Sequence, residues 1–172
     1  MDVRTRTITW HDPAEALGLA MSLTGLDFLH RIAAGQIPPP PVAELVGFRP
    51  TYVMPGRVVF AYEPREEHYN PLGTVHGGIL ATVLDTVMGC AVQSLLDAGV
   101  GYVTIELNTS FVRPVTLATG SLRAEGTVVH PGSRVSTAEA KLLDEADRLY
   151  AHATSTFLVK SDAGRAEAPL AA

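Results

Sequence analysis

The chain has 172 residues, 47% of them hydrophobic, which predicts one globular domain with a sizeable core. Its formal net charge of −5 argues against a general nucleic-acid binder, although local arginines can still hold an anionic small ligand. The single cysteine, Cys90, excludes an intrachain disulfide and is typical of a reducing compartment. Because neither an N-terminal signal nor an unbroken apolar span is visible, we expect a cytoplasmic protein with no membrane segment.

The first forty residues predict a helical extension that ends in a proline-rich spacer. Residues 1–11 look like a loose arm. Two short helices are expected over 12–34, with Asp12-Pro13 as the first start signal and Leu17, Leu26, Phe28, Leu29 and Ile32 as packing residues. The run 38–41 consists of four prolines and predicts a stiff extended segment.

Residues 41–160 predict an α+β domain, followed by a flexible tail over 161–172. Strands are expected at 45–52, 57–63, 102–112, 120–129, 134–143 and 149–159, with one long helix over 78–97 between the second and the third. Tight turns between strands indicate an antiparallel sheet, and a long apolar helix needs a sheet to lie against. We therefore expect a curved sheet that wraps one central helix.

The predicted central helix carries one carboxylate in its middle, Asp85, among mostly apolar residues. A helical wheel puts it in a narrow stripe of small or polar residues, namely Gly78, Thr82, Asp85, Thr86, Gly89 and Gln93. A carboxylate in such a place costs free energy unless it is hydrogen-bonded or used in chemistry. The stripe therefore predicts either a catalytic acid that lines a crevice or a helix contact in which a neighbouring hydroxyl satisfies Asp85.

The tripeptide His76-Gly77-Gly78 stands where an extended segment gives way to this helix. The first N–H groups of a helix lack partners within it, so they can bind an anion or a developing oxyanion. Gly77 and Asp85 lie about 12 Å apart along a helix that rises about 1.5 Å per residue, so one carbonyl cannot contact both in the same chain. If both act, two subunits must supply them across a two-fold interface, which predicts an obligate dimer with two shared sites.

Five further side chains are candidates, each with a plainer structural role beside the functional one. His76 either orients a substrate or bonds local backbone, and Asn70 either binds a water or holds a turn. Thr104 alternates with apolar neighbours in its strand and either holds Asp85 or a water, or is only structural. Arg113 and Arg134 either bind phosphates bidentately or remain solvated. The histidines are scattered and no zinc-type spacing occurs, so no metal is expected.

The stretch Asn70-Pro71-Leu72-Gly73-Thr74-Val75-His76-Gly77-Gly78, followed by Asp85 and Gly89, resembles the signature of hotdog-fold acyl-CoA thioesterases of the phenylacetate-degradation type. The likeness continues through 108–114 to the hairpin at 130–134 and covers roughly 41–160. The extension is also similar to the N-terminal segment of part of this family. The resemblance implies a hotdog fold, dimers that pair into a tetramer, and hydrolysis of a CoA thioester without metal. It implies no cofactor beyond the coenzyme A of the substrate.

The family's site residues carry over onto matching positions. Asp85 matches the catalytic acid, as general base or nucleophile, and Gly77 matches the amide that polarises the carbonyl. Asn70 and His76 match loop residues near the thioester, while Thr104 falls where some members have a hydroxyl that positions water. Aspartate at position 85, rather than glutamate, fits this subgroup better than the hydroxybenzoyl-CoA branch.

Two other functions stay open on the same fold. A hydratase or dehydratase would need a catalytic His/Asp pair, but its spacing, Asp followed five residues later by His, is absent from this helix. A non-catalytic acyl-CoA-binding module is the second, and retention of Asp85 and Gly77 argues against it. The acyl group is open, and the first forty residues either cap an acyl tunnel or cover a sheet edge.

Overall fold

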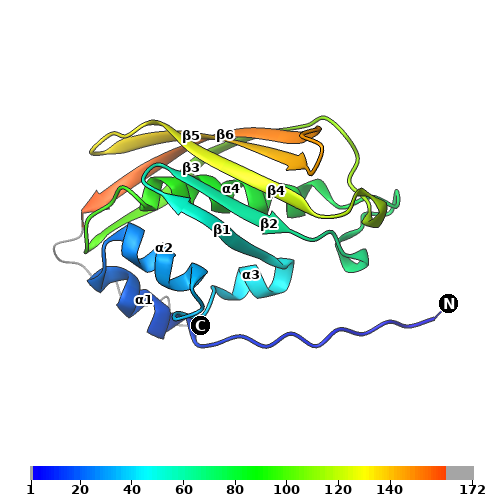
Figure 1. Cartoon of the computed structure of the whole chain (residues 1–172), viewed down its shortest axis with the longest axis horizontal. Coiled ribbons are helices and arrows are strands. Elements are labelled where there is room, and N and C mark those ends of the chain that lie inside the picture. The colour runs from blue at the N-terminus through cyan, green and yellow to red at the C-terminus, as the bar shows by residue number, and fades with distance from the viewer. Residues whose placement is uncertain (1, 162–172) are drawn as a thin grey trace.

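In the computed structural model, which describes residues 2–161, a six-stranded antiparallel sheet curves around one long helix (Figure 1). The strand order is β1-β2-β4-β5-β6-β3. The elements are α1 (Pro13–Ser22), α2 (Gly25–Ala33), α3 (Pro41–Val46), β1 (Phe48–Met54), β2 (Arg57–Tyr62), the 3-10 turn η1 (Glu66–His68), α4 (Gly77–Gln93), β3 (Val100–Phe111), the 3-10 turn η2 (Leu117–Thr119), β4 (Leu122–His130), β5 (Val135–Asp144) and β6 (Leu149–Ser161). The predicted α+β hotdog architecture with an N-terminal helical extension is confirmed.

The core lies between α4 and the concave side of the sheet. Large side chains on α4 are fully buried there, namely Val83, Leu84, Val87 and Met88. The sheet meets them mainly with small residues, among them Ala124, Ala138, Ala140, Ala151, Ala153 and Ser155, all buried. Small sheet residues allow the helix axis to come close, and at Gly126 an added Cβ would stand only 2.6 Å from the Val87 carbonyl oxygen.

The N-terminal extension forms the two predicted helices, each with a side-chain cap. The Asp12 carboxylate accepts a hydrogen bond from the Ala14 N–H at 2.9 Å, and the Thr24 hydroxyl accepts one from the Asp27 N–H at 3.2 Å. Leu17 was expected to pack, but it is 63% exposed, because α1 buries none of its residues. The predicted packing of α2 is correct, since Phe28 and Leu29 are buried.

Two predicted boundaries are wrong. The strand expected over 45–52 begins only at Phe48, because Pro41 starts the short helix α3 and Gly47, at φ +79°, ends it. The central helix ends at Gln93 rather than 97, since the Ser94 hydroxyl donates to the Ala91 carbonyl and accepts the Gly56 N–H from the β1–β2 turn.

The regular alternation expected along β3 is also wrong. A bulge between Thr104 and Glu106 leaves Ile105 without a partner on β6 and shifts the phase of the strand. Thr104 and Phe111 consequently both face α4, as their contacts with Asp85 and Gly77 establish. The outcome is a site residue at each end of the helix-facing side of β3, which strict alternation would not permit.

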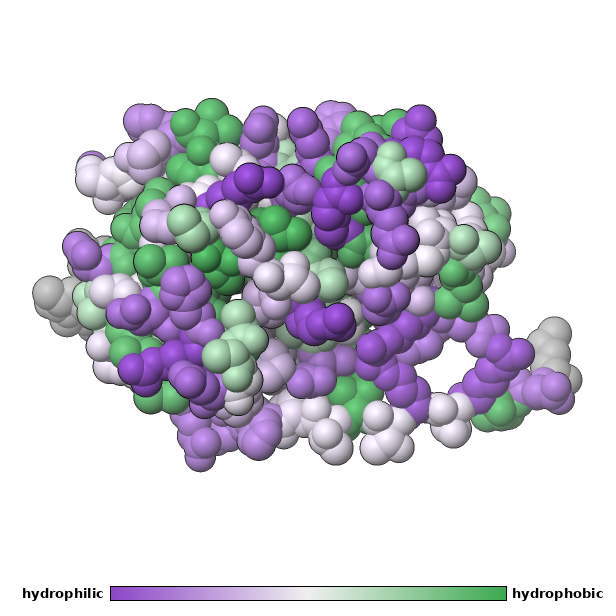
Figure 2. All heavy atoms as spheres, in the orientation of Figure 1, coloured by the Kyte–Doolittle hydropathy of each residue, from purple (hydrophilic) through white to green (hydrophobic). Residues whose placement is uncertain are grey.

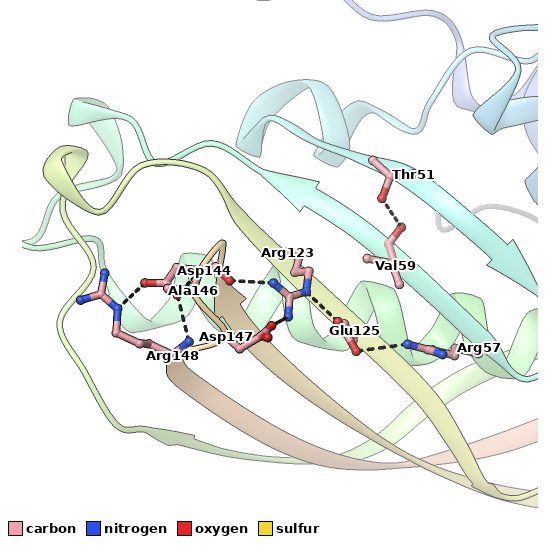
Figure 3. Close-up of polar contacts among 9 residues, drawn as sticks. All are labelled: Thr51, Arg57, Val59, Arg123, Glu125, Asp144, Ala146, Asp147 and Arg148. Atoms are coloured by element: carbon pink, nitrogen blue, oxygen red, sulfur yellow. Dashed lines mark hydrogen bonds and ion pairs between the residues drawn. The ribbon is translucent and has the colours of Figure 1, made fainter.

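Charged side chains join neighbouring strands on the outer surface of the sheet (Figure 3). Arg123 lies between Glu125, at 2.7 Å, and Asp147, and Glu125 also pairs with Arg57 at 3.4 Å. In the β5–β6 turn Asp144 is 4% exposed and accepts hydrogen bonds from two turn amides and from Arg148. The pairs made by Arg57, Arg123, Glu125 and Asp147 connect β2, β4 and the β5–β6 turn on the side away from α4, whereas Asp144 lies in phase with the buried residues of β5.

The arm before α1 has no regular structure, and Arg4–Glu66 and Arg6–Glu67 ion pairs connect it to η1. Figure 2 shows open space between this arm and the rest of the molecule; the hollow measures about 600 Å³ and is lined by polar and charged residues. Apart from Ser161, which ends β6, the tail predicted over 161–172 lies outside the described residues. Within 2–161, the helices are too short or too polar to cross a membrane.

We expect Gly126→Ala to lower the free energy of unfolding by roughly 1–3 kcal/mol, because its Cβ meets α4 backbone that cannot turn away. The control is Gly101→Ala, also in a strand, where an added Cβ meets nothing within 4 Å and the change should stay within about 0.5 kcal/mol. Urea unfolding of both variants measures the difference. Equal destabilisation by the two substitutions would contradict the close approach of α4 to β4.

Candidate active site

Asp85 stands half-buried in the middle of α4, facing the edge strand β3. The Thr104 hydroxyl donates a hydrogen bond to Asp85 Oδ1 at 3.1 Å. Burial raises the pKa of Asp85, and the Thr104 hydrogen bond opposes that rise. Within residues 2–161 no donor reaches Oδ2, so this oxygen can accept a proton or attack a carbon. The predicted contact between Thr104 and Asp85 is therefore present.

The side of Asp85 towards the C-terminus of α4 is walled by Tyr102, two residues before Thr104 on the same face of β3. Its ring lies against Gly89, where an added Cβ would be 2.7 Å from the Tyr102 hydroxyl oxygen. The ring also meets Phe157 edge-on, with centroids 5.6 Å apart. Sequence reasoning missed Tyr102, although two spacings point to it: Gly89 lies one helical turn beyond Asp85, and Tyr102 shares the face of Thr104.

At the start of α4 the backbone leaves one amide without an acceptor. His76 Nδ1 accepts the Gly78 N–H at 2.9 Å, and the His76 carbonyl accepts the amides of Ile79 and Leu80. Within the described residues, no acceptor is assigned to the Gly77 N–H. His76 thus takes the plainer of its two predicted roles, bonding local backbone, and the amide that remains is the one predicted to polarise a carbonyl.

Asn70 organises the loop that leads to His76. Its side-chain oxygen accepts the amides of Leu72 and Thr74 at 2.9 and 3.3 Å, while its side-chain NH₂ donates to the Thr74 hydroxyl at 3.1 Å. Gly73, at φ +78°, allows the tight turn between them. The turn role predicted for Asn70 is present, and it fixes the approach of the chain to the first helical amide.

A hollow of about 310 Å³ lies at this end of α4 and joins three of the predicted residues, Asn70, Gly77 and Arg113. Phe111 lines it as well, with its ring 3.0 Å from the position of a Gly77 Cβ. Sequence reasoning missed this contact because the bulge in β3 reverses the face on which Phe111 lies. The hollow does not include Asp85 or Thr104.

The two candidate arginines are far apart. Arg113 follows the end of β3 and donates to the Leu149 carbonyl. Arg134 comes just before Val135, which pairs with Leu158 of β6, and Leu158 pairs in turn with Val103 near the other end of β3. Phe111 is eight residues beyond Val103 in β3, so the two arginines are separated by roughly 27 Å along the strand direction in one chain. Within 2–161, no group of three or more His, Cys, Asp or Glu side chains is arranged to hold a metal.

All the predicted site residues except Arg134 therefore form two groups in one chain. Asp85 and Thr104 meet at the middle of α4, and Asn70, His76 and Gly77 meet at its start, with Arg113 beside them. The helix itself separates the two groups, as its rise per residue predicted.

Comparisons with known proteins identify relatives of the chain. The thioesterase superfamily matches residues 72–151, a range that contains His76, Gly77, Asp85, Thr104 and Arg113 but not Asn70. A protein of Halobacterium salinarum named as an esterase is 41% identical over 101 residues, which cover 57% of this chain and 65% of that protein. Acyl-coenzyme A thioesterase 13 of Homo sapiens is 33% identical over 63 residues, covering 37% of this chain and 44% of that protein. The matched regions span less than two thirds of both curated relatives.

A solved structure is similar over nearly its whole length. The phenylacetic acid degradation-related protein of Ralstonia eutropha JMP134 is 31% identical, with a TM-score of 0.69, and the match covers 76% of this chain and 98% of that one. Sequence motif, fold and this relative agree, and the chain belongs to the thioesterase superfamily.

Proposed function

We propose that the protein hydrolyses an acyl-CoA or aryl-CoA thioester to a free acid and CoA, without a metal, at a site shared between two subunits. The observation that carries this proposal is Asp85: a half-buried carboxylate with a raised pKa, one hydrogen bond and one uncommitted oxygen. Membership of the thioesterase superfamily supplies the reaction class, and the name of the human relative supplies the acyl-coenzyme A substrate class.

In the proposed reaction Asp85 acts as general base or as nucleophile. As a base, it takes a proton from water while the water oxygen attacks the thioester carbon; the tetrahedral intermediate then expels CoA as a thiolate, which is protonated. As a nucleophile, Asp85 attacks the carbon itself and expels the thiolate, leaving an anhydride that water hydrolyses. Both routes need the ionised carboxylate, which Thr104 stabilises by its hydrogen bond.

The carbonyl oxygen gains negative charge in either route, and we assign its stabilisation to the Gly77 N–H of a second copy. A single amide donor of this kind typically contributes roughly 3–4 kcal/mol to the barrier. The surface of β3 supports pairing of two copies. It is an edge strand, and its Val103, Ile105 and Phe111 are between 42% and 56% exposed. An apolar unpaired edge is unfavourable in a monomer.

The alternatives are weaker on the same observations. A hydratase needs a histidine that is available to act with the acid, but His76 Nδ1 is occupied as the acceptor of the Gly78 N–H at the start of α4. A binding module without catalysis has no use for a carboxylate whose burial costs free energy. The uncommitted Oδ2 of Asp85 favours chemistry over both.

We expect Asp85→Asn to lower thiol release from a panel of acyl- and aryl-CoA thioesters by about a hundredfold or more, the usual contribution of a general base. Asparagine keeps the shape and can still accept from Thr104, so fold and oligomeric state should remain. EDTA should leave wild-type release unchanged. Equal rates for the two proteins would remove Asp85 from the reaction, and loss of activity in EDTA would refute metal independence.

We expect Thr104→Val to move the acidic limb of the kcat profile to higher pH. The ionised carboxylate is the active form, so the rate rises as pH rises through the pKa of Asp85; loss of a hydrogen bond to the charged form raises that pKa further. Thr109→Val is the control, because it removes a buried hydroxyl without a partner in the described residues. A limb that stays in place in Thr104→Val would refute this coupling.

We expect mixtures of Asp85→Asn with Gly77→Pro to regain activity when subunits exchange. Proline removes the free N–H at the first helical position, where its ring is tolerated, and the extended His76 suits a following proline. One mixed dimer then contains one intact shared site, so statistical mixing restores about a quarter of wild-type activity. Gly77→Ala is the control, since it adds a Cβ towards Phe111 but keeps the N–H. No recovery despite exchange, verified by native mass spectrometry, would refute the shared site.

A further inference from the structure

A second hollow, of about 180 Å³, lies on the opposite side of Asp85 from the start of α4. We refer to it as the apolar pocket. Its walls come from α1, α2, the proline run, β1, β2, α4 and β3, and they include Ala16, Phe28, Ile32, Thr86, Cys90 and Tyr102. The N-terminal extension thus forms one wall and the catalytic helix the other.

The wall formed by the extension is held firmly against the rest of the domain. The Gly25 N–H donates to the Leu96 carbonyl at 2.9 Å, and an added Cβ at Gly25 would overlap the Gln93 carbonyl. On its other side, α2 reaches β1 through a 3.1 Å contact between His30 Nε2 and the Val53 carbonyl. The pocket is therefore part of the fold of this chain, with residues of α2, α4 and β1 in its walls; α2 lies beside β1 in Figure 1.

The apolar pocket runs along α4 from Thr86 towards the end of the helix, and Asp85 itself does not line it. Thr86 follows Asp85 directly, and Cys90 lies about 7.5 Å further along the helix axis than Asp85. Tyr102 connects the pocket to the carboxylate, because it lies two residues before Thr104 on the same face of β3 and Thr104 donates its hydroxyl to Asp85. The Thr86 hydroxyl donates a hydrogen bond to the Thr82 carbonyl at 2.7 Å. A ligand in the pocket therefore does not have to accept a hydrogen bond from this hydroxyl.

We propose that the apolar pocket holds the acyl group of the thioester substrate, and that α2 and α1 limit this group to a short chain or a single ring. The proposal rests on the proposed function. A cavity of roughly 150 Å³ with apolar walls stays dry and takes up benzene, which is close to the volume found here. When the thioester carbon lies at Asp85, the acyl group extends along α4 towards Cys90. The CoA moiety then extends in the opposite direction, towards the N-terminal end of α4 in the partner subunit.

The test varies the two walls that the extension supplies. Ile32→Ala enlarges the apolar pocket from α2, and Ala16→Leu narrows it from α1; both positions are half-buried, so the fold should tolerate the changes. Leu26→Ala is the matched control, a half-buried aliphatic residue of α2 that does not line the pocket. For each protein, kcat/KM is measured with butanoyl-, phenylacetyl- and dodecanoyl-CoA, and Kd for the same esters in the Asp85→Asn background.

We expect the dodecanoyl-to-butanoyl ratio of kcat/KM to rise roughly tenfold in Ile32→Ala and the phenylacetyl-to-butanoyl ratio to fall roughly tenfold in Ala16→Leu, with Kd ratios moving in the same directions. Leu26→Ala should leave all ratios in place. If both variants are folded and neither Ile32→Ala nor Ala16→Leu changes these ratios, the assignment of the pocket to the acyl group is overturned. If no ester is hydrolysed but Kd still follows the pocket variants, the proposed hydrolysis fails while the assigned acyl site stands.

Discussion

The close approach of α4 to the sheet is the constraint on which the site depends. It is possible only where the sheet lacks side chains, above all at Gly126, whose Cα faces the backbone of Val87. Because α4 lies so near, its exposed stripe comes within reach of the edge strand, and Asp85 meets Thr104 through a single hydrogen bond. A helix held one side chain further from the sheet would leave this carboxylate without a donor. Packing and chemistry are thus two consequences of the same row of small residues.

Burial of the Asp85 carboxylate lowers the stability of the fold, and the other residues of the stripe do not add to this free-energy cost. Thr82 and Thr86 donate their hydroxyls to helix carbonyls one turn back, at 2.9 and 2.7 Å, so they add no unsatisfied groups. The cost falls on Asp85 alone. Because its pKa is raised on folding, the native protein binds this proton more tightly than the unfolded chain. Stability therefore falls as pH rises from the ordinary pKa of aspartate through the raised value, and the ionised, reactive form is the less stable one.

Sequence patterns predicted the parts of the site that depend on one helix. The stripe containing Asp85, the free amide at Gly77 and the gap between them follow from helical geometry, which tertiary contacts seldom alter. What the sequence did not reveal depends on strand phase and on competition between elements. Nothing around Ile105 marks a bulge, yet one extra residue brings Phe111 to Gly77 and Thr104 to Asp85. Likewise, prolines that favour an extended chain also start a helix, as at the beginning of α3.

Helical geometry also limits how two copies can share the proposed site. Gly77 and Asp85 are equally far from Ala81, so a two-fold axis passing there would set two α4 helices antiparallel, with each Gly77 beside the other's Asp85. Ala81 and Thr82 are half-buried in one chain and small enough for a helix to approach. In such a pair the amide comes to Asp85 from the N-terminal side of α4, and the apolar pocket opens on the C-terminal side. The thioester carbon would then lie between them, with its acyl group enclosed by its own subunit's extension. Its CoA moiety would lie towards the partner, where Arg113 stands beside Gly77.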